Sequence, residues 1–400
     1  MPIIRDIRVI ATAPAGANLT VVRVETDEPQ LYGLGCATFT QRHLAVQTAV
    51  LAYLRPLLLG RPADRVEELW QLMMHNGYWR NGPVLNNAIA GVDIALWDIK
   101  AKQAGMPLYQ LLGGQCRAGA AIYRHADGRD LTEIEDNVRQ FLAQGVHYVR
   151  IQHGGYGGVE SAGRSRRPDG ALPGRYYDPR AYTRRALAAL EHVRTTLGEE
   201  LELLHDVHER LAPAAAVEFA RDCQALRLFF LEDPLAPEDL AWLDNIRRVC
   251  TTPLAMGELF NHPREWTPLI TGRQIDFMRM HLTQMGGLTP ARKVAALGEL
   301  HGVRTAWHGP GDVSPVGHAL NVHLDVAAPN FGIQEFSGFS DALQNVFPGC
   351  PELRGGYLYP NDRPGLGVDI DETLAAKFPC RDPVVEWTQA RLPDGSLHRP

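Results

Sequence analysis

Three acidic residues of the chain recur at one fixed spacing. Asp206, Glu232 and Glu258 lie 26 residues apart, and each stands at the polar end of a short, mostly apolar run, in LELLHD, LRLFFLED and TTPLAMGE. A buried parallel strand with its crossover helix and two loops takes roughly 25 to 40 residues. The spacing therefore predicts three successive strands of a βα barrel whose carboxylates face one mouth.

A shared mouth with three carboxylates needs a positive charge. The carboxylates repel one another and raise each other's pKa, so the arrangement persists only if a cation neutralises it. A ligand set made only of oxygen atoms favours a hard ion, and Mg²⁺ is the ion that we expect.

The rest of the chain supplies the elements that must position this site. Residues 1–117 begin with alternating strands and continue into helical patterns, which predicts an α+β capping domain. We expect residues 118–365 to form the barrel and residues 366–400 to return to the cap. Eight short strand candidates, mostly separated by helical segments, predict a closed parallel ring: AAIYRH, HYVRIQ, LELLHD, LRLFFLE, PLAMGE, DFMRMH, RTAWH and FGIQE.

Every one of these strand candidates carries a charged or titratable group at or near its C-terminal end. Catalysis in a βα barrel occurs at the C-terminal ends of the strands, so eight polar ends are harder to explain by scaffold needs than one or two. In chain order the residues are His125, Arg150, Asp206 with His208, Glu232, Glu258, Arg279, His308 and Glu335.

The composition excludes several classes of partner. The 400 residues carry a formal net charge of −6, which leaves no basic excess to neutralise nucleic-acid phosphates. The most apolar stretch, AVLAYLRPLLLG, is interrupted by Arg55 and Pro56 and is shorter than the roughly 20 residues of a membrane span. The six cysteines form no CxxC pair, and the first residues lack a signal-peptide layout. We therefore expect a cytoplasmic protein that binds a small molecule.

The motifs of the whole chain resemble those of the enolase superfamily, and within it the mannonate dehydratase subgroup. Relatives of the mandelate racemase type carry Lys-x-Lys on the second barrel strand and a His–Asp dyad on the seventh and sixth, where this chain has Arg150-Ile151-Gln152 and Arg279. The resemblance implies a modified TIM barrel of (β/α)7β type with an N-terminal α+β capping domain, and a homo-oligomer. It rests on YWRNGPV, GVDIALWDIKAKQAGMPLYQLLGG, YRHADG, YVRIQ, HDVHERL, EDPL, GELF, RMHLTQMGG and WHGPGDVSPVGHALNVHLD.

The chemistry implied by this resemblance is the loss of water from a sugar acid. A base removes the weakly acidic proton next to the carboxylate, and Mg²⁺ on Asp206, Glu232 and Glu258 stabilises the resulting enediolate. His208 lies two residues beyond Asp206, so strand alternation puts it on the same side, and we assign it as the general acid for the departing 3-hydroxyl. D-mannonate, or its epimer D-gluconate, would give 2-keto-3-deoxy-D-gluconate.

The resemblance assigns the base to an arginine of the second strand together with a tyrosine of the following loop. Arg150 fills the first role. Tyr156 in HGGYGG is the candidate for the second, because a neighbouring guanidinium lowers the pKa of a phenol from its usual value of about 10. The loop continues through a polar insert, so Tyr176 or Tyr177 is an alternative.

The remaining polar ends are interpreted as substrate contacts. Arginine can grip a carboxylate with two hydrogen bonds, and the cap position where the family usually has asparagine holds Thr40. That replacement, and Pro310 in HGPGD, which resembles members that dehydrate mannonate slowly or not at all, leave the identity of the sugar acid open. The predicted substrate-binding residues are Thr40, His125, Arg279, His308, Asp312 and Glu335.

Two other functions are the alternatives to the dehydratase. An epimerase or racemase of the same fold needs a base on each face of the substrate, and the missing Lys-x-Lys and dyad argue against it. A non-catalytic homologue would bind metal and acid for regulation, but such a module gains little from a proton donor such as His208 beside its metal ligands.

Overall fold

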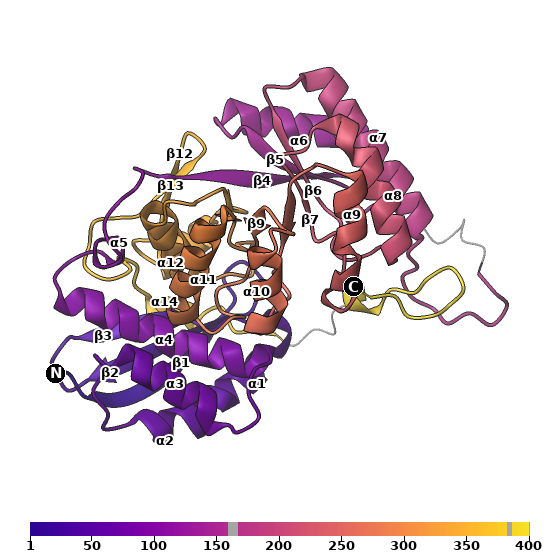
Figure 1. The fold of residues 1–400 in the computed structure, drawn as a ribbon. Helices are drawn as coiled ribbons and strands as arrows, with labels where there is room; N and C mark the ends of the chain where they lie inside the picture. Colours follow the sequence, from indigo (N-terminus) through magenta and orange to yellow (C-terminus); the bar gives the residue numbers. More distant parts are fainter. Residues whose placement is uncertain (159–166, 382–385, 400) are drawn as a thin grey trace. The chain divides into compact units, whose positions relative to one another are not determined.

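The computed structural model describes residues 1–158, 167–381 and 386–399. Its contacts divide the chain into two compact units, which are described separately (Figure 1). Unit 1 comprises residues 1–122, 257–271 and 278–382, and unit 2 comprises residues 123–256, 272–277 and 383–400.

Unit 1 contains the N-terminal cap, in which a three-stranded antiparallel sheet, β1-β2-β3, packs on a long buried helix, α4. Gly33 and Gly35 make the close packing possible, because a Cβ atom at either position would lie 1.9 Å from a carbonyl oxygen of α4. The first elements are β1 (Ile4–Thr12), β2 (Leu19–Thr26), β3 (Tyr32–Cys36), η1 (Thr40–Arg42), α1 (His43–Thr48), η2 (Ala49–Leu54), α2 (Arg55–Leu58), α3 (Val66–Asn76), α4 (Pro83–Gln103) and α5 (Leu108–Leu111).

Unit 1 also holds the later part of the predicted barrel. The Met278 carbonyl accepts a hydrogen bond from the Ala306 amide at 2.9 Å, just after the next strand. The Thr305 carbonyl accepts one from the Gly332 amide at 2.8 Å, just before the strand after that. The elements are α10 (Pro263–Thr271), β9 (Phe277–Met278, which begins at the last residue of a unit 2 segment), α11 (Leu288–His301), β10 (Arg304–Thr305), α12 (Pro315–Ala327), β11 (Gln334–Glu335), α13 (Asp341–Val346), β12 (Glu352–Arg354), β13 (Tyr357–Tyr359) and α14 (Glu372–Ala375).

Unit 2 is built on five neighbouring parallel strands, β4 to β8, each paired with the next one along the chain. Helices α6 and α7 pack on β5, and α7 begins at Pro179 after Asp178, whose side chain accepts a hydrogen bond from the Arg180 amide. The elements are β4 (Ala120–Gly128), α6 (Leu131–Ala143), β5 (Tyr148–His153), α7 (Pro179–Leu197), β6 (Glu202–Asp206), α8 (Pro213–Cys223), η3 (Gln224–Leu226), β7 (Phe230–Glu232), η4 (Pro237–Trp242), α9 (Leu243–Val249), β8 (Leu254–Met256) and η5 (Glu386–Gln389).

All eight predicted barrel strands occur, as β4 to β11 in chain order. The C-terminal stretch divides between the two units. Ala375 and Phe378 accept hydrogen bonds from Thr12 and Ala13 of the cap, whereas Arg391 accepts one from Tyr177 in unit 2. The domain boundaries at 117 and 365 stay predictions.

None of the helices in the described ranges has the length and apolar character needed to span a bilayer.

A buried histidine of unit 1 makes stability depend on pH. His323 Nδ1 accepts a hydrogen bond from the Tyr109 amide at 3.2 Å and Nε2 contacts the Leu366 carbonyl at 3.1 Å, so the neutral ring satisfies both partners. Burial lowers its pKa from 6.5 to about 4. Between these values the unfolded chain binds more protons, so the folded state loses stability as the pH falls.

We expect His323 alone to remove about 2 kcal/mol of the free energy of unfolding between pH 7 and pH 5. Urea unfolding of the wild-type protein and of His323→Gln at both pH values measures this contribution. The variant is less stable at pH 7 and should show a weaker dependence on pH. An equal dependence in both proteins would contradict the assignment.

Candidate active site

The site of unit 2 is centred on two carboxylates at adjacent strand ends. Asp206 ends β6 and Glu232 ends β7, and the parallel register makes them direct partners. Both side chains are buried, at 1% and 0% exposure. Two buried carboxylates side by side are stable only where positive charge compensates them.

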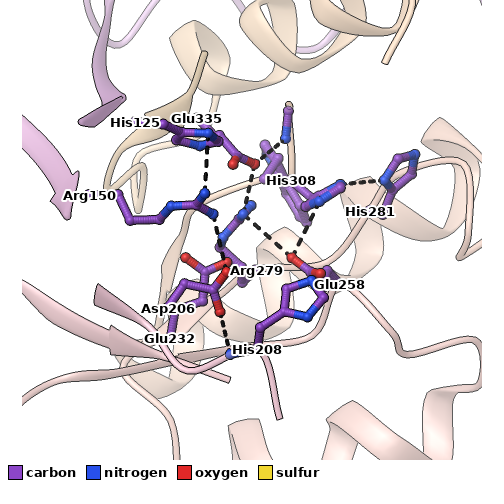
Figure 2. A network of polar contacts seen from close by, with 12 residues as sticks. His125, Arg150, Asp206, His208, Glu232, Glu258, Arg279, His281, His308 and Glu335 are labelled. Atoms are coloured by element: carbon purple, nitrogen blue, oxygen red, sulfur yellow. Dashed lines mark hydrogen bonds and ion pairs between the residues drawn. The ribbon is translucent and has the colours of Figure 1, made fainter. Parts of the chain in front are cut away.

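Arg150 of β5 supplies part of that charge (Figure 2). Its Nη1 donates to Asp206 Oδ2 at 3.1 Å, and its Nη2 lies 3.3 Å from Nδ1 of His125 on β4. One guanidinium carries one positive charge, and Asp206 and Glu232 carry two negative charges when ionised. The pair therefore has the donor chemistry and the charge that suit a hard divalent cation.

The turn after β6 holds His208 in an unusual backbone conformation. His208 and Glu209 have φ values of 53° and 51°, a left-handed region that residues with a side chain rarely adopt. The backbone amide of His208 donates to Asp206 Oδ1 at 2.7 Å, which fixes this turn to the strand-end carboxylate. Backbone strain of this kind is typical of functional sites.

Tyr156 lies beside the same carboxylate. Its hydroxyl donates to Asp206 Oδ2 at 3.2 Å, and its ring centroid is 4.8 Å from that of His208. The guanidinium of Arg210 lies 4.4 Å from the centre of the tyrosine ring. Tyr156 has a φ of 68° within the sequence GGYGG, where the glycines permit a left-handed turn.

The two alternative tyrosines have other surroundings. The Tyr176 hydroxyl donates to the Leu172 carbonyl at 2.8 Å. Tyr177 is fully buried, its ring stacks on His398 at 4.6 Å, and burial raises the pKa of its phenol. The Tyr177 ring therefore holds the loop to the C-terminal segment, whereas the Tyr176 hydroxyl makes a contact within the loop. Residues 159–166 of the loop lie outside the described residues.

The polar cluster of unit 1 is centred on Arg279, whose side chain is fully buried (Figure 2). Its Nη2 donates to Glu335 Oε2 at 2.7 Å and lies 3.6 Å from Glu258 Oε2. The Gly309 amide donates to the same Glu335 oxygen at 2.8 Å. Arg279, predicted as a substrate contact, thus makes a charged hydrogen bond to Glu335 and an ion pair with Glu258.

His308 joins this cluster and brings in a residue that the sequence did not single out. Its Nε2 lies 3.3 Å from Glu258 Oε2, and its Nδ1 lies 2.5 Å from Nδ1 of His281. His281 stands two residues after Arg279 in RMH, so strand alternation could have assigned it to the same side.

Two further predicted substrate contacts also lie in unit 1. The hydroxyl of Thr40 donates to the Asn18 carbonyl at 3.3 Å. Burial, together with the charge of Glu335, raises the pKa of Asp312 to about 6. The structure thus groups six predicted site residues in unit 2 and six in unit 1: His125, Arg150, Tyr156, Asp206, His208 and Glu232, and Thr40, Glu258, Arg279, His308, Asp312 and Glu335.

Two family models match most of the chain. Residues 3–113 match the N-terminal domain of mandelate racemase and muconate lactonizing enzyme, and residues 133–374 match the enolase C-terminal domain-like family. A D-galactonate dehydratase family member of Musicola paradisiaca is 52% identical over 99% of both chains. Another, from Pantoea ananatis, is also 52% identical over 99% of both chains.

Solved structures agree with these matches. The crystal structure of an enolase from Pantoea ananatis with bound D-gluconate and Mg is 51% identical, covers 100% of both chains and has a TM-score of 0.97. A member of the enolase superfamily from Salmonella Typhimurium, 21% identical over 95% of this chain and 99% of its own, shares the fold with a TM-score of 0.83. These findings confirm the predicted fold, a capping domain followed by a βα barrel. The relatives carry the name of D-galactonate dehydratase rather than of the predicted mannonate subgroup, and the chain belongs to the D-galactonate dehydratase family of the enolase superfamily.

Proposed function

We propose that the protein is a Mg²⁺-dependent sugar-acid dehydratase that converts D-mannonate or D-gluconate to 2-keto-3-deoxy-D-gluconate. One observation carries the proposal: two buried carboxylates, Asp206 and Glu232, stand in register beside Arg150, Tyr156 and His208. Further support comes from a relative of 51% identity whose structure contains D-gluconate and Mg, and from relatives named for D-galactonate dehydratase.

Asp206, Glu232 and Glu258 are the proposed ligands of the metal. All three offer carboxylate oxygen, the ligand type that Mg²⁺ prefers, and the first two are almost completely buried. When bound, Mg²⁺ stabilises the negative charge that develops on the substrate carboxylate during proton removal.

Tyr156 is the proposed base. Tyr156 and Arg150 both contact Oδ2 of Asp206, at 3.2 and 3.1 Å, so the phenol and the guanidinium meet at the same carboxylate oxygen. The phenolate oxygen takes the proton from C2 of the sugar acid. Electrons of the broken C–H bond then form the enediolate.

His208 is the proposed acid that completes the elimination. Its ring lies against that of Tyr156, so base and acid are neighbours on the same side of unit 2. The imidazolium gives its proton to the 3-hydroxyl, the C3–O bond breaks and water leaves. The resulting enol becomes the 2-keto acid when C3 takes a proton from solvent.

The substrate class can be tested with a library of sugar acids that includes D-mannonate, D-gluconate and D-galactonate. We expect formation of a 2-keto-3-deoxy acid with Mg²⁺ and no reaction with EDTA, because proton removal next to a carboxylate needs charge stabilisation. Release of a C2 epimer instead of a keto acid would indicate the epimerase. Binding of Mg²⁺ without turnover of any acid would favour the non-catalytic homologue.

Two assignments made from the sequence stay predictions. These are the cytoplasmic location and the homo-oligomer.

A further inference from the structure

The contact between His281 and His308 demands that a proton lie between two ring nitrogens. The two Nδ1 atoms are 2.5 Å apart, and the ring centroids are 4.7 Å apart (Figure 2). At that distance two lone pairs, or two N–H groups, would repel each other. One ring therefore donates and the other accepts.

The charge of His281 determines how many of its ring nitrogens carry a proton. Its side chain is buried at 5% exposure, and burial lowers its pKa from 6.5 to about 4. The charged or titratable groups that act on it are Glu335, Arg279 and His318. At neutral pH the His281 ring is therefore uncharged and carries a single N–H group.

The single N–H of His281 is best placed on Nδ1. Among the described residues, Nε2 of His281 has no hydrogen-bond partner. A proton on Nε2 would thus leave a buried donor unsatisfied, which is unfavourable. With the proton on Nδ1, His281 donates to His308 Nδ1 and its own Nε2 keeps a lone pair.

The position of this proton determines whether Nε2 of His308 carries a proton or a lone pair. A neutral His308 that accepts at Nδ1 must carry its own proton on Nε2, which lies 3.3 Å from Glu258 Oε2. The reverse arrangement would direct a lone pair of Nε2 at the carboxylate oxygen, which is repulsive. A His308 protonated at both nitrogens would force the proton of His281 onto Nε2, which has no partner among the described residues. The arrangement that leaves no buried N–H group without a partner is therefore the one in which His281 donates.

We propose that His281 is a positioning residue that holds His308 as a hydrogen-bond donor at Nε2. The catalytic role of His308 in this inference rests on the proposed function. In that role His308 stabilises negative charge on the substrate and is not a second base. It follows that His308 does not supply the second base that interconversion of C2 epimers needs.

Two substitutions separate hydrogen bonding from packing. His281→Asn keeps a side-chain N–H close to the position of Nδ1, whereas His281→Phe keeps the volume and removes the donor. We expect His281→Phe to lower kcat by about 10–100-fold with a smaller change in KM, the usual cost of losing a partner that orients an active-site group, and His281→Asn to recover most of the loss. Equal loss in both folded variants, or no loss in His281→Phe, would overturn the proposal.

The proton positions can also be measured without turnover. Long-range ¹H–¹⁵N spectra of the wild-type protein at pH 7, with and without Mg²⁺, distinguish protonated from unprotonated ring nitrogens. We expect His308 to be protonated at Nε2 only, and a His308 protonated at Nδ1 would overturn the assignment. The spectra need no substrate. If the protein were inactive on every sugar acid, the proposed function would be refuted, and the spectra would still test whether His281 donates to His308.

Discussion

Replacing Glu232 with glutamine is expected to abolish the dehydration of sugar acids, with a fall in kcat/KM of about 10³-fold or more, equivalent to about 4 kcal/mol. Glu232 is fully buried and is the register partner of Asp206. The amide has nearly the same volume but no negative charge, so the proposed site loses much of its attraction for Mg²⁺. Calorimetric titration with MgCl2 and an assay for the keto acid measure both effects.

Glu199→Gln is the matched control. Glu199 is exposed and pairs with Arg227 at 2.6 Å on the surface of unit 2, where an ion pair contributes little to stability. We expect this variant to bind Mg²⁺ and to react like the wild-type protein. Unchanged Mg²⁺ affinity and activity in Glu232→Gln would refute the assignment of Glu232 as a ligand.

Removal of the Tyr156 hydroxyl is the second substitution with a large expected effect. Tyr156→Phe should lower kcat by about 10²–10⁴-fold, the range that general base catalysis contributes, because the phenylalanine ring has no oxygen to take the C2 proton. Mg²⁺ affinity should stay close to that of the wild-type protein, since Tyr156 is not among the proposed ligands. Steady-state kinetics and calorimetry separate the two quantities.

Tyr176→Phe provides the comparison for this experiment. Its hydroxyl donates to the Leu172 carbonyl in the same loop, and its side chain is 1% exposed. We expect about 1 kcal/mol less stability and an unchanged kcat. A large loss of kcat in Tyr176→Phe, with Tyr156→Phe active, would transfer the role of base to the other end of the loop.

The strand ends were the part of the site that the sequence predicted best. A buried strand leaves a run of apolar letters, and the polar residue that ends it is visible without any knowledge of the fold. The runs before Asp206 and Glu232 are β6 and β7, and the register makes the two residues partners, as a shared mouth requires. The superfamily was identified in the same way, from motifs spread over the whole chain.

Contacts between different strand ends could not be predicted, because spacing gives no information on which side chains meet. Arg279 was interpreted as a substrate contact, and the structure gives it a 2.7 Å contact with Glu335. His281 was missed although strand alternation, which singled out His208, places it on the same side as Arg279, and its partner His308 is visible only in the structure. The motifs indicated the mannonate dehydratase subgroup, whereas the relatives carry the name of D-galactonate dehydratase.

The loop after β5 shows a third limit. The sequence left Tyr156, Tyr176 and Tyr177 as alternatives, since each stands in a Gly-rich or polar stretch. The structure separates them by backbone conformation and side-chain contacts: a φ of 68° accompanies the contact of Tyr156 with Asp206, whereas Tyr177 is buried against His398. Positive φ values at residues other than glycine are rarely predictable from residue type.

The measurement that tests the central claim most directly follows the reaction of D-mannonate and of D-gluconate with the Mg²⁺-loaded protein in D2O by ¹H NMR. Proton removal from C2 followed by loss of the 3-hydroxyl predicts 2-keto-3-deoxy-D-gluconate with one deuterium at C3, because the enol takes its new proton from solvent. Neither product nor exchange at C2 for any sugar acid, from a protein that demonstrably binds Mg²⁺, would contradict the account.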